Sequence, residues 1–84
     1  MQIEEIKSKI KQIMFETTNI KPEDIEDNAS FVDDLHLDSL TLLEIAVNID
    51  HEFSLDIPED DMQKFNTVQV SAELVMQQLA PVSA

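Results

Sequence analysis

Apolar residues recur along the first part of the chain at the spacing of an amphipathic helix. Isoleucines stand at i, i+3, i+7 and i+10, with a methionine beside the last of them: Ile3, Ile6, Ile10, Ile13 and Met14. This period places apolar side chains on one face and leaves most charged positions on the other. The pattern predicts a helix over about residues 3–16 that packs into a core.

A second helical pattern, over about residues 39–53, contains more apolar positions than one buried face requires. One set can face the core: Ala46, Ile49 and Phe53, joined by Leu42 and Ile45. Another set repeats with similar spacing on a neighbouring face: Leu40, Leu43 and Val47, with Glu44 and Asp50 at its border. An apolar strip bordered by carboxylates is typical of a docking surface, but a wholly buried helix would show the same pattern. The periodicity leaves both interpretations open.

The residues between these two helices, about 17–37, are predicted to form a long loop. Lys21-Pro22 opposes continuation of the first helix, because the residue before a proline is pushed out of the helical region. Apolar residues are spaced irregularly in this stretch, as in a loop that contacts the core at several points. The chain contains no glycine, so its turns must use residues such as Asn28, Asp33 and Asp34.

Two further helices are predicted in the C-terminal part of the chain. Pro58 and the acids that follow it favour the start of a short helix over about residues 58–64. Asn66-Thr67 can cap a last helix over about residues 67–79, whose apolar positions repeat at helical spacing: Val68, Ala72, Val75 and Leu79.

These patterns together predict one all-α domain that spans residues 1–84. The alternation typical of strands is absent, and residues 80–84 are expected to be frayed. The expected architecture is a four-helix bundle of three long helices and one short helix, with the long loop between the first two.

The chain is strongly acidic. It has 18 Asp and Glu residues against five Lys and no Arg, which gives a formal net charge of −13 at pH 7. Direct binding to nucleic acid is disfavoured because it requires positive charge, whereas an acidic surface favours encounter with basic partners. No apolar run is long enough for a membrane span or a signal peptide, and cysteine is absent. We expect a cytoplasmic monomer that binds neither nucleic acid nor membrane.

The start of the second helix carries a short motif. Asp and Ser are favoured where a helix begins, because their side-chain oxygens can bond the free N–H groups of the first turn. Leu37-Asp38-Ser39-Leu40, followed by Leu43-Glu44-Ile45, also resembles the attachment motif of acyl carrier proteins. The resemblance extends over nearly the whole chain, since that family has the same order of helices around a long first loop.

The resemblance implies a function and a cofactor. Ser39 would carry a 4′-phosphopantetheine arm, installed from coenzyme A by a phosphopantetheinyl transferase, and Asp38 and Leu40 would support the attachment motif. The arm would hold acyl intermediates as thioesters. A discrete carrier of this type would present them to separate enzymes, such as acyltransferases and ketosynthases, of fatty acid, polyketide or related lipid biosynthesis.

The resemblance also implies two surfaces on the bundle. Partner enzymes would dock on the strip described above: Leu40, Leu43, Glu44, Val47 and Asp50. An opening for the acyl chain would be lined by the third helix together with Phe31, Leu42 and Ala46.

Two positions depart from the pattern of that family. His36 stands where the family usually has glycine, and Thr41 stands where fatty-acid carriers usually have an acidic residue. Both departures are compatible with attachment of the arm at Ser39, but they leave open which biosynthetic pathway the carrier would serve. An aminoacyl or peptidyl carrier is an alternative, although an Asp before the serine resembles acyl carriers more closely.

Other classes of function fit the residues less well. An acidic helical binding module without a covalent arm, such as a nucleic-acid mimic or an adaptor, would share the composition. Catalysis is disfavoured because Ser39, His36 and an acid (Asp34 or Asp38) would lie on one short surface segment with no pocket to exclude water. No metal site is expected, since an EF-hand needs a glycine at its sharp turn and two isolated histidines do not make a zinc site. We therefore predict a carrier and not an enzyme.

Overall fold

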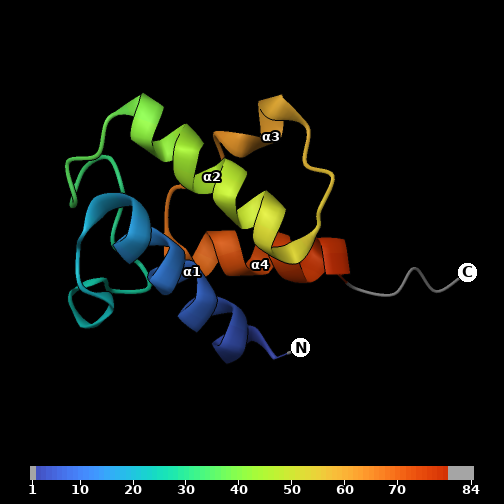
Figure 1. Ribbon diagram of the computed structural model, residues 1–84, viewed down its shortest axis with the longest axis horizontal. Coiled ribbons are helices and arrows are strands. Elements are labelled where there is room, and N and C mark those ends of the chain that lie inside the picture. The colour runs from blue at the N-terminus through green and yellow to red at the C-terminus, as the bar shows by residue number, and fades with distance from the viewer. Residues whose placement is uncertain (1, 80–84) are drawn as a thin grey trace, which may run out of the picture.

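The computed structural model of the protein describes residues 2–79, and every regular element in that range is helical. Four α-helices occur: α1 (Ile3–Thr18), α2 (Ser39–Phe53), α3 (Glu59–Met62) and α4 (Val68–Leu79). α1 and α4 cross each other in the lower half of Figure 1, while α2 lies above them and α3 lies beside α2. The predicted all-α bundle of three long helices and one short helix is confirmed. The segment 80–84, expected to be frayed, lies outside the described residues.

Two helices differ in length from the prediction for local reasons. α1 continues to Thr18, two residues beyond the predicted end, because Asn19 adopts the left-handed conformation (φ 68°) and donates its N–H to the Phe15 carbonyl. α3 ends at Met62 because the chain then tightens into a turn, in which the N–H of Lys64 bonds the Asp61 carbonyl at 3.1 Å. α3 is therefore a single turn of helix.

The core is formed by side chains from α1, α2, α4 and the connecting segments. The buried apolar residues are Ile6, Ile10, Ile13, Met14, Ile25, Phe31, Ile45, Ala46, Ile49, Phe53, Ile57, Phe65, Val68, Ala72 and Val75. The inward faces predicted for the first two long helices are confirmed, except that Ile3 and Leu42 are only half-buried. Leu79 was predicted to continue the buried face of α4, and this is wrong: it is 41% exposed at the end of the helix, one turn beyond Val75.

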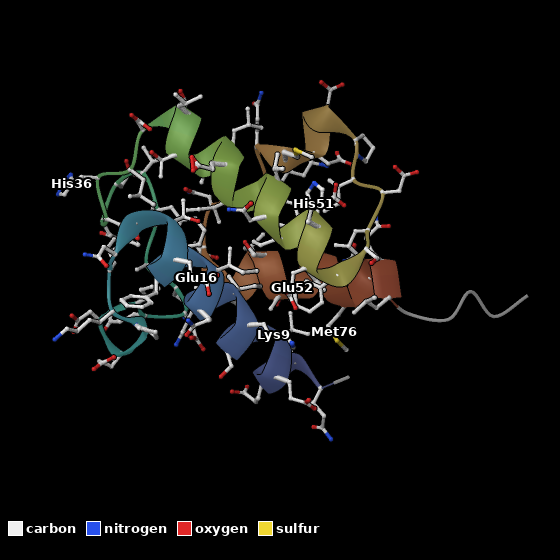
Figure 2. All side chains as sticks on the ribbon, in the orientation of Figure 1. Lys9, Glu16, His36, His51, Glu52 and Met76 are labelled. Carbon is white, nitrogen blue, oxygen red and sulfur yellow. The ribbon has the colours of Figure 1, made fainter. Side chains whose placement is uncertain are left out.

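Polar contacts fix α2 against α1. Lys9 of α1 and Glu52 near the end of α2 form an ion pair at 3.4 Å, and Figure 2 shows the two side chains in the region where the helices meet. Nearer the start of α2, the Asn48 amide donates to the Thr17 hydroxyl at 3.1 Å. Each contact joins a residue near the end of one helix to an interior residue of the other, and together the two contacts define how α2 lies across α1.

The long loop between α1 and α2 is attached to the start of α4 through its backbone. The N–H of Phe31 donates to the Asn66 carbonyl at 2.8 Å, and the N–H of Gln69 donates to the Asp27 carbonyl at 2.8 Å. The Phe31 side chain is fully buried. The loop is therefore a fixed part of the bundle, as its scattered apolar residues predicted. Its attachment to the core fixes where α2 begins.

The same loop is attached to α1 through a carboxylate between two lysines. The Asp27 carboxylate lies 2.9 Å from the Lys11 ammonium and 3.1 Å from the Lys7 ammonium. Hydrogen bonds from Lys11 first, and then from Lys7, hold the pKa of Asp27 below its ordinary value of 3.8. Because the folded pKa is lowered, this contact contributes stability at pH values above about 4 and loses it as the pH falls through the folded pKa.

We expect Asp27→Asn to lower the free energy of unfolding at neutral pH by about 1 kcal/mol. This magnitude is small for two ion pairs because the Asp27 side chain is 35% exposed and solvent screens the charges. The difference from the wild type should shrink as the pH falls below about 4. Urea denaturation at neutral pH and at about pH 3.5 measures it, with Asp33→Asn at an exposed loop position as the control. A difference that stays constant with pH would contradict the assignment.

Candidate functional site

The predicted attachment motif lies at the first turn of α2. Asp38 is the residue that caps the helix, and its Oδ1 accepts the backbone N–H of Thr41 at 2.8 Å. Ser39 is the first helical residue and is exposed. The expectation that Asp38-Ser39 opens a helix is met by the described structure, in which Ser39 is exposed to solvent.

The Asp38 carboxylate is held in its ionised form by the helix that it caps. The backbone N–H of Thr41, and then its hydroxyl, keep the pKa of Asp38 below its ordinary value of 3.8. The cap is therefore charged at neutral pH, and its contribution to stability is lost only as the pH falls below about 4 toward the folded pKa. Thr41 is therefore a hydrogen-bond partner of Asp38. The sequence analysis had singled out Thr41 only as a departure from the family pattern.

His36, three residues before Ser39, adopts a backbone conformation that favours glycine. Its φ angle is 57°, in the left-handed region, and its imidazole extends away from the helices at the outer edge of the loop (Figure 2). The resemblance stated above places a glycine where this chain has His36, and the fold adopts a positive φ at this position. Histidine tolerates this region better than most non-glycine residues.

We expect His36→Gly to raise the free energy of unfolding by about 0.5–1 kcal/mol. A left-handed residue costs about 1–2 kcal/mol, and the added freedom of glycine in the unfolded chain offsets part of that gain. His36→Val should instead lower stability by about 1–2 kcal/mol, because a β-branched residue is poorly accommodated there. Urea denaturation of both variants tests whether His36→Gly is more stable, and His36→Val less stable, than the wild type. Equal stabilities would contradict this prediction.

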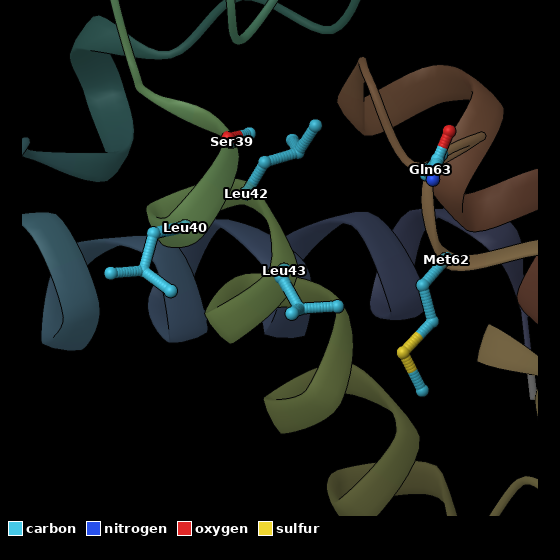
Figure 3. A pocket seen from close by; sticks show the side chains of 6 residues that line it. All are labelled: Ser39, Leu40, Leu42, Leu43, Met62 and Gln63. Carbon is cyan, nitrogen blue, oxygen red and sulfur yellow. The ribbon is translucent and has the colours of Figure 1, made fainter. Parts of the chain in front are cut away.

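An open pocket of about 540 Å³ lies beside the exposed serine, within the size range of ligand sites. Its lining residues come from α2 and from the end of α3: Ser39, Leu40, Leu42, Leu43, Met62 and Gln63. In Figure 3, Leu42 and Leu43 extend from α2 toward the segment that carries Met62 and Gln63, whereas Leu40 extends to the other side of α2. The wall of the pocket is mainly apolar, with the Ser39 hydroxyl and the Gln63 amide as its polar groups.

The expected opening for an acyl chain is only partly correct in its residues. Leu42 and the third helix border the pocket, as expected. Phe31 and Ala46 do not, because both are fully buried in the core. Gln63 was not singled out from the sequence, since a polar residue after a short helix carries no periodic signal.

The outer face of α2 is exposed rather than buried. Leu40 is 73% exposed and Leu43 is 38% exposed, with Glu44 exposed beside them. Val47 is half-buried. Asp50 is also half-buried, and its Oδ1 is enclosed without a hydrogen-bond partner among the described residues. The alternative of a wholly buried helix is therefore wrong, because α2 covers the core with one face only.

The sequence also raised the questions of a nucleophile–base pair, a metal site and a membrane span, to which the following observations on residues 2–79 relate. No hydrogen bond within that range joins Ser39 to His36, whose imidazole extends outward (Figure 2). Over the same residues, no group of three or more His, Asp or Glu side chains could hold a metal ion. Nor does any described helix have the length and apolar character needed to cross a membrane.

Comparison with known proteins identifies relatives over most of the chain. A family profile described as a phosphopantetheine attachment site matches residues 8–75. The acyl carrier protein of Buchnera aphidicola subsp. Schizaphis graminum is 44% identical over 70 residues, which cover 83% of this chain and 89% of the relative. The acyl carrier protein of Buchnera aphidicola subsp. Acyrthosiphon pisum (strain Tuc7) is 41% identical over 70 residues, with 83% and 88% covered.

Two solved structures have a similar fold. The acyl carrier protein from Enterococcus faecalis superimposes with a TM-score of 0.75 at 26% identity, covering 93% of this chain and 99% of that one. The apo doublet acyl carrier protein from prodigiosin biosynthesis superimposes with a TM-score of 0.80 at 25% identity, covering 89% of this chain and 36% of that one.

The four-helix fold and the family match together define the class of small carrier domains. The chain belongs to the phosphopantetheine-attachment family of acyl carrier proteins. It is a carrier of acyl groups and not an enzyme, and its cofactor is 4′-phosphopantetheine. The residues present fit such a group, because the exposed Ser39 at the first turn of α2 borders a mainly apolar pocket that the end of α3 also lines.

Proposed function

We propose that Ser39 is the residue that carries the 4′-phosphopantetheine arm, and that the protein presents acyl groups to separate enzymes of fatty acid, polyketide or related lipid biosynthesis. The residue assignment is supported above all by where Ser39 lies. Ser39 is exposed at the first position of α2, it follows the charged cap Asp38, and its side chain borders the apolar pocket.

The chemistry at Ser39 is a transfer of the phosphopantetheinyl group from coenzyme A, catalysed by a separate transferase. The Ser39 Oγ forms a bond to the phosphorus that bears pantetheine, and the pyrophosphate bond of coenzyme A breaks. The adenosine bisphosphate half of coenzyme A leaves, and the hydroxyl proton passes to a base of the transferase. When attached, the arm supplies a terminal thiol that holds an acyl group as a thioester.

The residues around Ser39 support this transfer by holding the backbone of the first turn in place. The Asp38 carboxylate fixes the first turn of α2 through its bond to Thr41, so the Ser39 backbone does not fray. Leu40 is exposed immediately after Ser39 and offers an apolar contact at the site of attachment. Asp38 is a positioning residue, and Ser39 alone takes part in the bond change.

Partner enzymes are proposed to dock on the exposed face of α2. Leu40 and Leu43 supply the apolar centre, with Val47 at its inner side, and Glu44 supplies negative charge at the rim. Asp50 adds less because it is half-buried. The net charge of −13 favours encounter with enzymes that carry basic patches: the transferase, acyltransferases and ketosynthases. We infer that the carrier works as a monomer in the cytoplasm, where these enzymes would encounter it.

Reversing the rim charge should slow the transferase without unfolding the carrier. We expect Glu44→Lys to lower kcat/KM for attachment of the arm by about tenfold at low salt, because electrostatic steering raises association rates. The deficit should shrink at high salt, since exposed charges are then screened. Leu40→Ala should also slow attachment, with a deficit that salt does not remove. Glu16→Lys, an equal charge change at an exposed position of α1, is the control; equal rates for all variants would remove the docking assignment.

Incubation with a broad-specificity phosphopantetheinyl transferase and coenzyme A tests the proposed function directly. Intact mass should increase by one phosphopantetheine group, and the proteolytic fragment that contains Ser39 should carry the whole increase. An acidic binding module or nucleic-acid mimic would gain no mass. Either that result or attachment to a different serine would overturn the proposal.

A further inference from the structure

His36 has a strained backbone conformation and a side chain that the fold does not use. Its φ angle of 57° lies in the left-handed region, which is unfavourable for any residue that has a Cβ atom. The side chain is exposed, and its imidazole makes no hydrogen bond or ion pair among the described residues. A strained residue of this kind beside a functional site is a candidate for a contact outside the folded chain.

The backbone on both sides of His36 is held in place. On one side, the N–H of Leu35 bonds the Ser30 carbonyl at 3.1 Å. On the other side, the N–H of Leu37 bonds the Phe31 carbonyl at 2.9 Å. Both leucines also pack against the core as half-buried residues. The chain between them is therefore fixed, and the imidazole extends outward from it at the edge of the loop (Figure 2).

His36 lies within the area that a phosphopantetheinyl transferase must cover. It precedes Ser39 by three residues, so the two Cα atoms are at most about 11 Å apart. A specific interface buries about 800 Å² on each partner, which corresponds to a disc of about 16 Å radius. The transferase must bring the phosphorus of coenzyme A within bonding distance of the Ser39 Oγ, so its interface includes the surroundings of Ser39. Enzymes that act on the thiol at the far end of the arm do not have this requirement.

Resting on the function proposed above, we propose that His36 is a recognition residue for the phosphopantetheinyl transferase. Its imidazole N–H donates a hydrogen bond to the transferase while Ser39 receives the arm, and it takes no part in the bond change. This contact accounts for an imidazole at a position where glycine would be the more stable residue.

The surroundings of His36 indicate the kind of group that it meets. Asp33, Asp34 and Asp38 are exposed close to it in the sequence, and no Lys or Arg occurs between residues 22 and 63. Basic groups of the transferase can pair with these carboxylates. The imidazole N–H is instead a hydrogen-bond donor, so it requires an acceptor. The group opposite His36 is therefore a carboxylate or carbonyl oxygen of the transferase, set among basic groups.

The test measures the kinetics of arm attachment for two variants that lack the imidazole but differ in stability. His36→Gly should be more stable than the wild type and His36→Ala less stable, because glycine adopts the left-handed region without steric cost. Both should lower kcat/KM for the carrier by the same factor, about threefold to tenfold, which is the usual effect of one hydrogen bond. The loss should appear as a higher KM for the carrier, with kcat and the KM for coenzyme A unchanged.

His51→Ala is the matched control. His51 is the chain's other histidine, is also exposed, and lies in α2 about 18 Å from Ser39 by the rise of the helix. Its removal should leave the kinetics at the wild-type values, and equal slowing of His51→Ala would contradict a specific role for His36. Rates that follow stability, with His36→Gly unimpaired, would overturn the proposal. A changed KM for coenzyme A in place of the carrier would do the same. If the wild type gained no arm, the proposed function itself would fail.

Discussion

Ser39→Ala should abolish attachment of the phosphopantetheine arm. The substitution removes the oxygen that must bond to phosphorus and changes little else, because Ser39 is exposed and its side chain makes none of the hydrogen bonds described in residues 2–79. Stability should stay within about 0.5 kcal/mol of the wild type, as is usual for a surface substitution. Intact mass after incubation with the transferase and coenzyme A measures attachment, and urea denaturation verifies that the variant is folded.

Ser8→Ala is the matched control for this experiment. Ser8 is also an exposed serine in a helix, but it lies in α1, away from the pocket. It should gain the arm at the wild-type rate. If Ser39→Ala still gained mass, the attachment residue would lie elsewhere in the chain. If both variants failed to gain the arm, the failure of Ser39→Ala would not be evidence that Ser39 is the attachment residue.

Ser71→Ala should stabilise the protein by about 2 kcal/mol. Ser71 of α4 is fully buried, and its Oγ has no hydrogen-bond partner among the described residues. An unsatisfied buried hydroxyl costs about 1–3 kcal/mol, and alanine is in addition the better helix former by about 0.5 kcal/mol. For a domain of this size the gain corresponds to a rise of about 8–16 °C in the thermal midpoint. Thermal and urea denaturation both measure it.

The same substitution at an exposed helical position separates these two contributions. Ser8→Ala changes helix propensity alone, so its gain should be about 0.5 kcal/mol. The excess at Ser71 over Ser8 is then the cost of burying the hydroxyl. A destabilising Ser71→Ala would mean that the hydroxyl has a partner within the core, and the assignment would have to be withdrawn.

The helices were predictable because their apolar periods and capping residues are local in sequence. Ile6 and Ile10 on α1, and Ala46 and Ile49 on α2, were assigned to the core from spacing, and all four are fully buried. The start of α2 was equally predictable, because Asp38 can form its cap with a residue only three positions away. The predicted end of α1 was too early because Asn19 adopts a left-handed conformation that caps the helix. The residues around Asn19 gave no sign of this cap in the sequence.

The pocket was predicted less well, because it depends on which residues from distant segments meet. Phe31 was expected at its wall but serves as a core residue, since its backbone N–H bonds Asn66 and draws the loop inward. Gln63 borders the pocket only because α3 stops after one turn. Neither fact is visible in a periodic pattern, which describes one helix at a time.

By itself, the sequence determined that this protein is a helical carrier with a serine at the start of its second long helix, because periodicity, capping and the attachment motif act within a few residues. Only the tertiary structure decided which face of α2 is exposed and which residues share a pocket with Ser39. The reason is that exposure depends on the neighbours that α1, α3 and α4 provide. An apolar side chain such as Leu43 is exposed because no other segment within residues 2–79 covers it.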